Sequence, residues 1–128
     1  MKKNILLDMS ATLIHHGHVR LIKKASKFGN VIIALTRDNE IKKHKGYIPE
    51  IKFNHRKEIL QSFTNVHKVV ACNFIITDRF LKNLKIDFLV HGNDNVNKVS
   101  KKKIKILKRT KGISSTIIRK KACKNIKK

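Results

Sequence analysis

Three histidines of the chain, His15, His16 and His18, lie close together, and the first and last of them flank Gly17 in the pattern H-x-G-H. Imidazole N–H groups can donate hydrogen bonds to phosphate oxygens. A helix that begins here would add unpaired backbone N–H groups and a partial positive charge, and Gly17 would let a ligand approach the backbone. The pattern therefore indicates an anion-binding site. Two alternatives stay open: a metal-ligand set, although no cysteine or carboxylate is spaced to complete one, and histidines that only cap a helix.

A second candidate cluster occupies residues 108–116, with the sequence KRTKGISST. Arg109 and Lys111 precede a run of hydroxyl side chains at the expected start of the last helix, and such a helix start can bind phosphate. The same Ser-Ser-Thr run can also serve only as a helix cap. Taken alone, this cluster leaves both interpretations open.

Hydrophobic periodicity predicts alternating strands and helices that would position these clusters. The expected strands are 4–8, 31–35, 66–71, 86–91 and 103–107, and the expected helices are 16–28, 54–63, 78–84 and 114–122. Asn54 and Ser114 are the expected N-caps of two of these helices. Residues 37–53 are polar, contain the only proline, and are predicted to form a long active loop. The lysine-rich end, 120–128, is predicted to fray.

This alternation implies right-handed crossovers and a parallel sheet. The predicted fold class is therefore α/β, with one Rossmann-like domain over residues 1–128, about five parallel strands and helices on both faces of the sheet. Ligands of such sheets bind beyond the carboxyl ends of the strands. Chemistry is expected just after Asp8, Leu35, His91 and Leu107.

Charge is the most conspicuous feature of the composition. The 128 residues include 31 Lys and Arg against 8 Asp and Glu, which gives a formal net charge of +23. This excess suggests a polyanionic partner, but 25 of the basic residues are lysines and only 6 are arginines, whose rigid fork is favoured in base and phosphate recognition. Six Phe, one Tyr and no Trp also supply a base-stacking surface poorly. These counts argue for caution about a nucleic-acid partner, but charge alone decides nothing.

Other classes are excluded by simple counts. No apolar run approaches the roughly 18 residues needed to span a bilayer, and the apolar stretch at the N-terminus is too short for a signal peptide. Two cysteines, Cys72 and Cys123, cannot build a disulfide framework or a zinc site alone. A cytoplasmic protein is the expectation.

Five segments in order, HHGH, KGY, HRKEIL, DFLVHGND and RTKGISST, resemble the small cytidylyltransferases of the nucleotidyltransferase superfamily. The nearest likeness is to glycerol-3-phosphate cytidylyltransferases, with the choline- and ethanolamine-phosphate enzymes as relatives. The resemblance runs from Ile5 to Arg119. It implies CTP as a substrate and a homodimer.

The resemblance also implies roles for individual residues. His15 and His18 would contact the CTP phosphates and stabilise the transition state. Lys45 would contact these phosphates or that of the substrate, and Arg56 would reach the acceptor phosphate. The implied nucleotide-binding residues are Ser10 and Gly17 at the triphosphate, Gly92 and Asp94 at the cytosine, and Arg109, Thr110, Gly112, Ile113, Ser114 and Ser115 in the late segment.

The implied reaction transfers CMP from CTP to a phosphorylated alcohol, glycerol 3-phosphate first, and releases pyrophosphate. The acceptor phosphate has a second pKa of about 6 and is largely a dianion at neutral pH, so it needs no strong base. Catalysis would rest on positioning and electrostatics, with His15, His18, Lys45 and Arg109 as donors. Mg²⁺ would neutralise the leaving pyrophosphate.

Departures from the family pattern leave the acceptor open. The family commonly reads G-T-F-D before its H-x-G-H, so Thr12 stands where an aspartate would support the first histidine, and Asn93 replaces an acidic residue. Phosphocholine, phosphoethanolamine and a phosphonate are alternative acceptors. An ATP-dependent adenylyltransferase is an alternative enzyme, and a basic nucleic-acid-binding protein on a degenerate fold is the non-enzymatic alternative.

Overall fold

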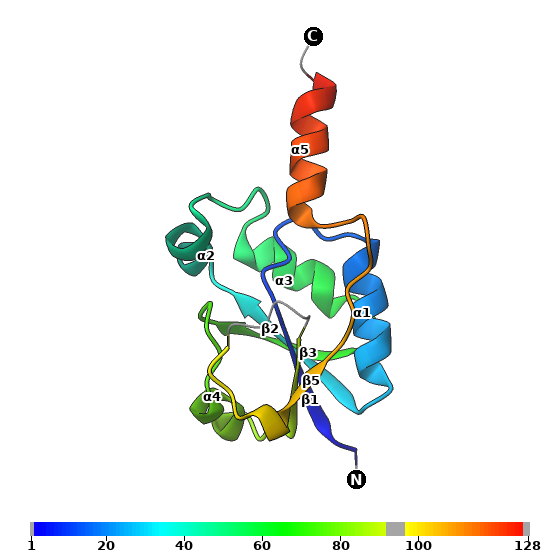
Figure 1. Cartoon of the computed structure of the whole chain (residues 1–128), viewed down its shortest axis with the longest axis vertical. Helices are drawn as coiled ribbons and strands as arrows, with labels where there is room; N and C mark the ends of the chain where they lie inside the picture. The colour runs from blue at the N-terminus through cyan, green and yellow to red at the C-terminus, as the bar shows by residue number, and fades with distance from the viewer. Residues whose placement is uncertain (1, 92–96, 127–128) are drawn as a thin grey trace.

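A five-stranded parallel sheet forms the centre of the computed structural model, which describes residues 2–91 and 97–126 (Figure 1). The strands are β1 (Asn4–Met9), β2 (Asn30–Thr36), β3 (Val66–Cys72), β4 (Phe88–His91) and β5 (Ile104–Ile106), in the spatial order β3-β2-β1-β4-β5. The order reverses at β1, which pairs with β2 on one side and β4 on the other. Open α/β sheets bind their ligands at this kind of reversal, beyond the carboxyl ends of the strands.

Helices cover both faces of the sheet, which confirms the predicted fold class. The helices are α1 (His16–Ser26), α2 (Asp38–Lys45), α3 (Phe53–Gln61), α4 (Asp78–Asn83) and α5 (Ser115–Ile126), with a short 3₁₀ turn at Lys101–Lys103. Ile22 of α1 and Leu60 of α3 pack with alternate strand residues on one face. Leu81 of α4 packs with the intervening residues on the other face. Each central strand is therefore buried on both sides, as its continuous apolar run predicts.

The predicted loop 37–53 is wrong for its first half, because residues 38–45 form α2. This helix buries only Ile41, so it lacks the apolar stripe by which sequence periodicity would find it. Asp38 and Glu40 in its first turn and lysines in its last turn complement the helix dipole. Gly46 ends the helix in the left-handed conformation, with φ of 80°.

The expected N-cap of α3 also differs from the structure. Lys52, not Asn54, is the N-cap residue, and its side chain makes no capping hydrogen bond. The cap comes from α2 instead, because Asp38 Oδ2 accepts the Phe53 N–H at 3.2 Å. A cap supplied from a distant segment leaves no local signal in the sequence.

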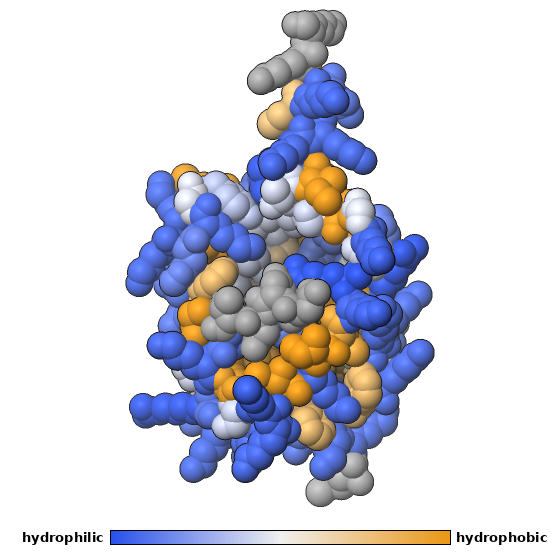
Figure 2. All heavy atoms as spheres, viewed as in Figure 1, coloured by the Kyte–Doolittle hydropathy of each residue, from blue (hydrophilic) through white to orange (hydrophobic). Residues whose placement is uncertain are grey.

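The C-terminal segment forms a helix where fraying is expected. α5 continues to Ile126, and none of its twelve residues, all of them described, is buried. The helix projects from the rest of the domain (Figure 1), and Figure 2 shows mostly hydrophilic side chains along it. Ser114 caps it as predicted, since its hydroxyl accepts the Ile117 N–H at 3.1 Å. Within the described residues, no helix has the length and apolar character needed to cross a membrane.

Candidate active site

One cavity of about 350 Å³ opens at the carboxyl ends of the strands, where β1 leads into α1. It gathers three segments that lie far apart in the sequence: residues 8–18, the end of α2, and residues 109–116. The predicted site residues that line it are Ser10, His15, Gly17, His18, Lys45, Arg109, Thr110, Ile113, Ser114 and Ser115. Arg56 and Gly112 do not line it, and Gly92 and Asp94 lie outside the described residues. The structure thus brings the two candidate clusters together.

The two histidines of the H-x-G-H pattern cap α1 with the same ring atom. His15 is the N-cap residue, and its Nδ1 accepts the Gly17 N–H at 3.0 Å. His18 Nδ1 accepts the His15 N–H at 3.1 Å. An Nδ1 that accepts a hydrogen bond carries no proton, so each neutral ring carries its proton on Nε2. Both residues line the cavity. The capping and phosphate-donor interpretations are therefore compatible, because they use opposite nitrogens of each ring.

Burial and neighbouring charge keep both rings neutral. Burial lowers the pKa of His18 to about 3, and the proximity of His15, Arg109 and Lys45 disfavours a further positive charge and adds to this effect. The pKa of His15 is lowered as well, chiefly by burial and then by His16 and Arg109. The geometry agrees with these directions, because a proton on Nδ1 of either ring would abolish the hydrogen bond that the ring accepts. The site presents neutral N–H donors beside fixed cations.

Histidine ¹⁵N–¹H spectra test this protonation state. We expect His15 and His18 to show the Nε2–H tautomer at neutral pH, and His18 to stay neutral far below 6.5, its ordinary pKa. Between that value and about 3 the unfolded chain binds the extra proton, so the free energy of unfolding should fall as the pH is lowered through this window. A His18 resonance that titrates near its ordinary value would contradict the assignment.

Gly17 is required by the packing of its own neighbours. A Cβ at this position would lie 2.8 Å from His15 Cε1 and 3.2 Å from Ile113 Cγ2. The absence of a side chain lets the His15 ring fold back over the helix start and lets the 109–116 segment close against it. Gly17 also lines the cavity, so the expected role, in which the glycine gives a ligand access to the backbone, stays a prediction.

Two cations, Lys45 and Arg109, line the cavity together with the histidines. Lys45 is the last residue of α2, and its segment turns at Gly46, whose N–H donates to Lys42 O at 3.0 Å. Arg109 follows β5 and lines the same cavity. Both charges act on the pKa of His18. These groups form a cluster suited to a ligand with several negative charges.

The late segment contributes structure as well as cavity wall. The Ser115 hydroxyl donates to Leu13 O at 2.9 Å and accepts the Leu13 N–H at 3.1 Å, so it fastens α5 to the β1–α1 connection. The Ser114 hydroxyl is used by the helix cap. Gly112 has φ of 78° with open space around it, which indicates a turn residue outside the cavity. Thr110 and Ile113 complete the wall.

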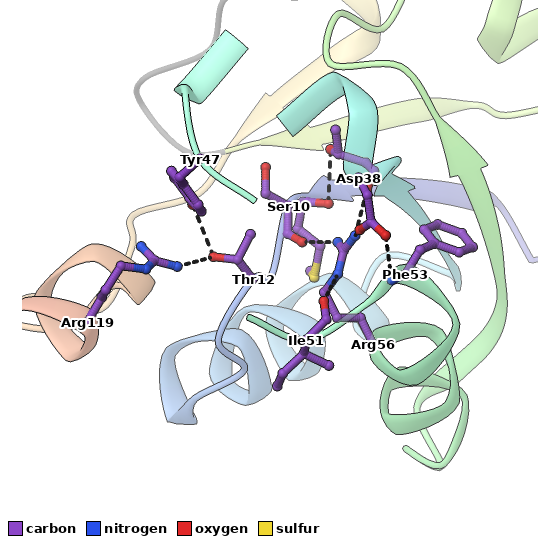
Figure 3. A network of polar contacts seen from close by, with 10 residues as sticks. Ser10, Thr12, Asp38, Tyr47, Ile51, Phe53, Arg56 and Arg119 are labelled. Atoms are coloured by element: carbon purple, nitrogen blue, oxygen red, sulfur yellow. Dashed lines mark hydrogen bonds and ion pairs between the residues drawn. The ribbon is translucent and has the colours of Figure 1, made fainter. Parts of the chain in front are cut away.

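Arg56 lies inside the protein, which differs from the expected contact with an acceptor phosphate. Its side chain is fully buried. Nε donates to Ile51 O at 3.0 Å, Nη1 to Ser10 O at 2.5 Å, and Nη2 to Thr36 O at 3.1 Å and Asp38 Oδ1 at 2.5 Å (Figure 3). Three carbonyls and a carboxylate thus accept hydrogen bonds from the guanidinium. Its hydrogen bond to the Ser10 carbonyl holds the backbone of a residue that lines the cavity.

Sequence reasoning did not assign roles to three polar residues of the cavity. Asp8 is the penultimate residue of β1, only 8% of its side chain is exposed, and its Oδ1 lies 2.5 Å from His91 Nδ1. Asn97 Nδ2 donates to Asp8 Oδ2 at 2.9 Å. All three line the cavity. Asp8 and His91 had a signal, since both lie at carboxyl ends of predicted strands, whereas Asn97 follows no element that periodicity could locate.

The site shows no protein cage for a metal ion. Among residues 2–91 and 97–126, no group of three or more His, Cys, Asp or Glu side chains is placed to hold one. Of the described acidic residues, Asp8 lines the cavity, and both its oxygens already have partners, on His91 and Asn97. The His15 and His18 Nδ1 atoms are likewise occupied.

Comparison with known proteins gives a consistent set of relatives. The model of the cytidylyltransferase-like family matches residues 10–121. The chain is 30% identical over 125 residues to a glycerol-3-phosphate cytidylyltransferase of Staphylococcus aureus, with 91% of this chain and 92% of that protein covered. It is 28% identical over 124 residues to an ethanolamine-phosphate cytidylyltransferase of Dictyostelium discoideum, with 88% of this chain covered. The chain spans only 34% of the length of that second relative.

A solved structure shares the fold. The lipopolysaccharide core biosynthesis protein from Thermoplasma volcanium GSS1 superposes with a TM-score of 0.72, at 17% identity, over 86% of this chain and 99% of that one. At this identity the likeness concerns the fold alone. It agrees with a single α/β domain built on a parallel sheet.

Proposed function

Because the chain belongs to the cytidylyltransferase-like family, we propose that it transfers CMP from CTP to a small phosphorylated alcohol, glycerol 3-phosphate first, and releases pyrophosphate. One observation carries the proposal: the neutral rings of His15 and His18, with Nδ1 of each occupied, line one cavity together with Lys45 and Arg109. Such a cluster of N–H donors and cations suits a triphosphate.

The proposed step exchanges one bond at the α-phosphorus of CTP. An oxygen of the acceptor phosphate attacks this atom and forms the new P–O bond. The bond from the α-phosphorus to the bridging oxygen breaks, and pyrophosphate leaves with the electron pair. No protein proton has to move, because the acceptor is already a dianion. Nε2–H of His15 and His18 would donate to the oxygens on which charge develops, while Lys45 and Arg109 offset the repulsion between two anionic reactants.

Mg²⁺ belongs to this proposal as a companion of the nucleotide. The described cavity residues fit an ion held mainly by phosphate oxygens and water, which is how Mg²⁺ usually binds beside nucleotides. When bound, it would neutralise charge on the leaving pyrophosphate.

Glycerol 3-phosphate is proposed first because the relative with that activity in its name matches this chain over nearly its whole length. Ethanolamine phosphate comes second, since the proteins named for it match over about a third of their own length. The homodimer implied by the family resemblance stays a prediction.

A substrate panel tests the proposal. Pyrophosphate release should be measured with CTP or ATP and Mg²⁺, against glycerol 3-phosphate, phosphoethanolamine, phosphocholine and 2-aminoethylphosphonate. We expect release with CTP, dependent on the acceptor, and highest with glycerol 3-phosphate. Acceptor-dependent release with ATP but not with CTP would make the protein an adenylyltransferase. No release with any pair, together with nucleic-acid affinity that falls by roughly one log unit per log of salt for each phosphate contacted, would favour the non-enzymatic alternative.

A further inference from the structure

Arg119 joins two segments that each contribute a residue to the cavity lining, Thr12 before α1 and Tyr47 after α2. It lies on α5, and Nη2 donates to Thr12 Oγ1 at 3.0 Å and to Glu50 Oε1 at 2.7 Å. Nε donates to the second oxygen of Glu50. The guanidinium also covers the ring of Tyr47, with its carbon 4.2 Å from the ring centroid. The hydrogen bond from Arg119 lowers the pKa of the Glu50 carboxyl, so the pair is charged at neutral pH.

Arg119 contacts residues that line the cavity, although its own side chain is not part of the described lining. Tyr47 and Thr12 line the cavity, and their hydroxyl oxygens lie 3.2 Å apart, whereas Arg119 is not one of the described lining residues. Figure 3 shows Tyr47 and Arg119 converging on Thr12 from two different elements. Lys45, the last residue of α2, is two residues before Tyr47. Contacts that hold Tyr47 therefore act close to the end of α2, from which the Lys45 side chain extends.

Besides those of Arg119, the hydrogen bonds that tie α5 side chains to other described segments are those of Ser115. None of the residues of α5 is buried, and the helix projects from the domain beyond its first turns (Figure 1). Ser115 ties it to Leu13, which belongs to the β1–α1 connection. The Arg119 contacts are what join it to the segment between α2 and α3, because Glu50 and Tyr47 both belong to that segment. A bidentate arginine with a ring beneath it holds such a joint in one geometry.

We propose that Arg119 is a positioning residue: through Glu50, Tyr47 and Thr12 it fixes the turn after α2, and thereby places Lys45 at the phosphate-binding cluster. The kinetic part of this inference rests on the proposed function. The structural part does not, because it can be tested without any enzyme activity. The chain contains one tyrosine and no tryptophan. Tyrosine fluorescence therefore reports on Tyr47 alone.

The first experiment measures acrylamide quenching of Tyr47 fluorescence in the full chain without nucleotide. Arg119→Ala uncovers one face of the ring and should raise the quenching constant. Glu50→Gln, which removes the carboxylate that holds the arginine, should raise it in the same direction. Lys120→Ala, at the exposed neighbouring position on α5, is the matched control and should leave it unchanged. Unchanged quenching in both test variants would overturn the proposed joint.

The second experiment measures pyrophosphate release. Arg119→Ala should lower kcat by up to about 10²-fold, the cost of a small misplacement of a catalytic group, with thermal unfolding near that of the wild type. Arg119→Lys should rescue little, since an ammonium cannot span both oxygens of Glu50. Lys45→Ala should cost much less in the Arg119→Ala background than in the wild type, because the lysine is already displaced there.

Glu50→Gln separates positioning from direct contact with substrate. If Arg119 acts through the joint, this variant lowers kcat in parallel with Arg119→Ala. If Arg119 instead leaves Glu50 to bind phosphate, Glu50→Gln frees the arginine, and kcat stays the same or rises. That result would overturn the inference. Additive effects of Arg119→Ala and Lys45→Ala on kcat would overturn it as well. A wild-type protein that releases no pyrophosphate would contradict the proposed function, while the quenching result would still decide whether the joint exists.

Discussion

Replacement of His18 by alanine is expected to lower kcat by about 10²–10³-fold while the protein stays folded. Removal of one preorganised donor to a developing anion typically costs about 2.7–4 kcal/mol of transition-state stabilisation. His18 meets the conditions for such a donor. Its ring is mostly buried, its pKa is lowered to about 3, and its Nδ1 is occupied by the His15 N–H, which leaves Nε2–H for the ligand. Steady-state pyrophosphate release under saturating CTP measures the loss.

Two further variants separate donation from helix capping. His16→Ala is the matched control, because His16 occupies the variable position of the motif, is exposed and lies outside the cavity lining; its kcat should stay near that of the wild type. His18→Gln keeps an acceptor for the His15 N–H, as in an ordinary capping box, and should restore the stability of the helix start. Full recovery of kcat in His18→Gln would mean that His18 acts only as a cap. Near-normal turnover in a folded His18→Ala protein would show that His18 has no role in the chemical step.

The site could be located from the sequence because it lies at strand ends. The motifs with His15 and Arg109 follow the first and last strands, and parallel strands place all their carboxyl ends at one edge. The continuous apolar runs of β1 and β2 are strong signals for buried strands, so this part of the prediction had a firm physical basis. The distance of about ninety residues between the motifs in sequence did not matter, since the sheet order brings them together.

Long-range side-chain contacts could not be predicted in the same way. Thr12 appears in the sequence as a lost carboxylate, yet in the structure it is held by Tyr47 and Arg119, and a carboxylate reaches the same arginine from Glu50. Nothing local to Thr12 encodes this arrangement. The support of His15 comes instead from the backbone of its own helix start, which H-x-G-H spacing does encode.

The basic residues include two groups, those that line the cavity and those on exposed surfaces. Lys45 and Arg109 line the cavity, and their charge is felt by His18. The lysines of α5, by contrast, lie on a helix with no buried residue, where they add charge that can steer anions but specifies no ligand. A strongly anionic pair of small substrates accounts for the first group without requiring a polyanion.

Replacement of Arg56 by alanine is expected to destabilise the fold rather than to weaken one substrate. The change leaves the carbonyls of Ser10, Thr36 and Ile51 without their donor and opens a cavity beneath the site. Breaking a buried charged network by removing one partner costs about 3–5 kcal/mol, and the 40% exposure of the Asp38 side chain, which water can solvate, places the expected loss toward the lower figure. That is a large part of the roughly 5–15 kcal/mol that holds a domain folded. Urea unfolding measures it.

The matched control is Arg20→Ala, which removes an exposed arginine from α1 and should change the free energy of unfolding by no more than about 0.5 kcal/mol. Below its unfolding midpoint, Arg56→Ala should raise KM for CTP and for the acceptor together, because Arg56 holds the Ser10 carbonyl and Asp38 rather than either ligand. If the variant is as stable as the wild type and KM rises for the acceptor alone, Arg56 contacts the acceptor phosphate and the structural role is wrong. An arginine that binds substrate and one that builds the floor under it look the same in sequence; burial and its four protein partners are what distinguish them.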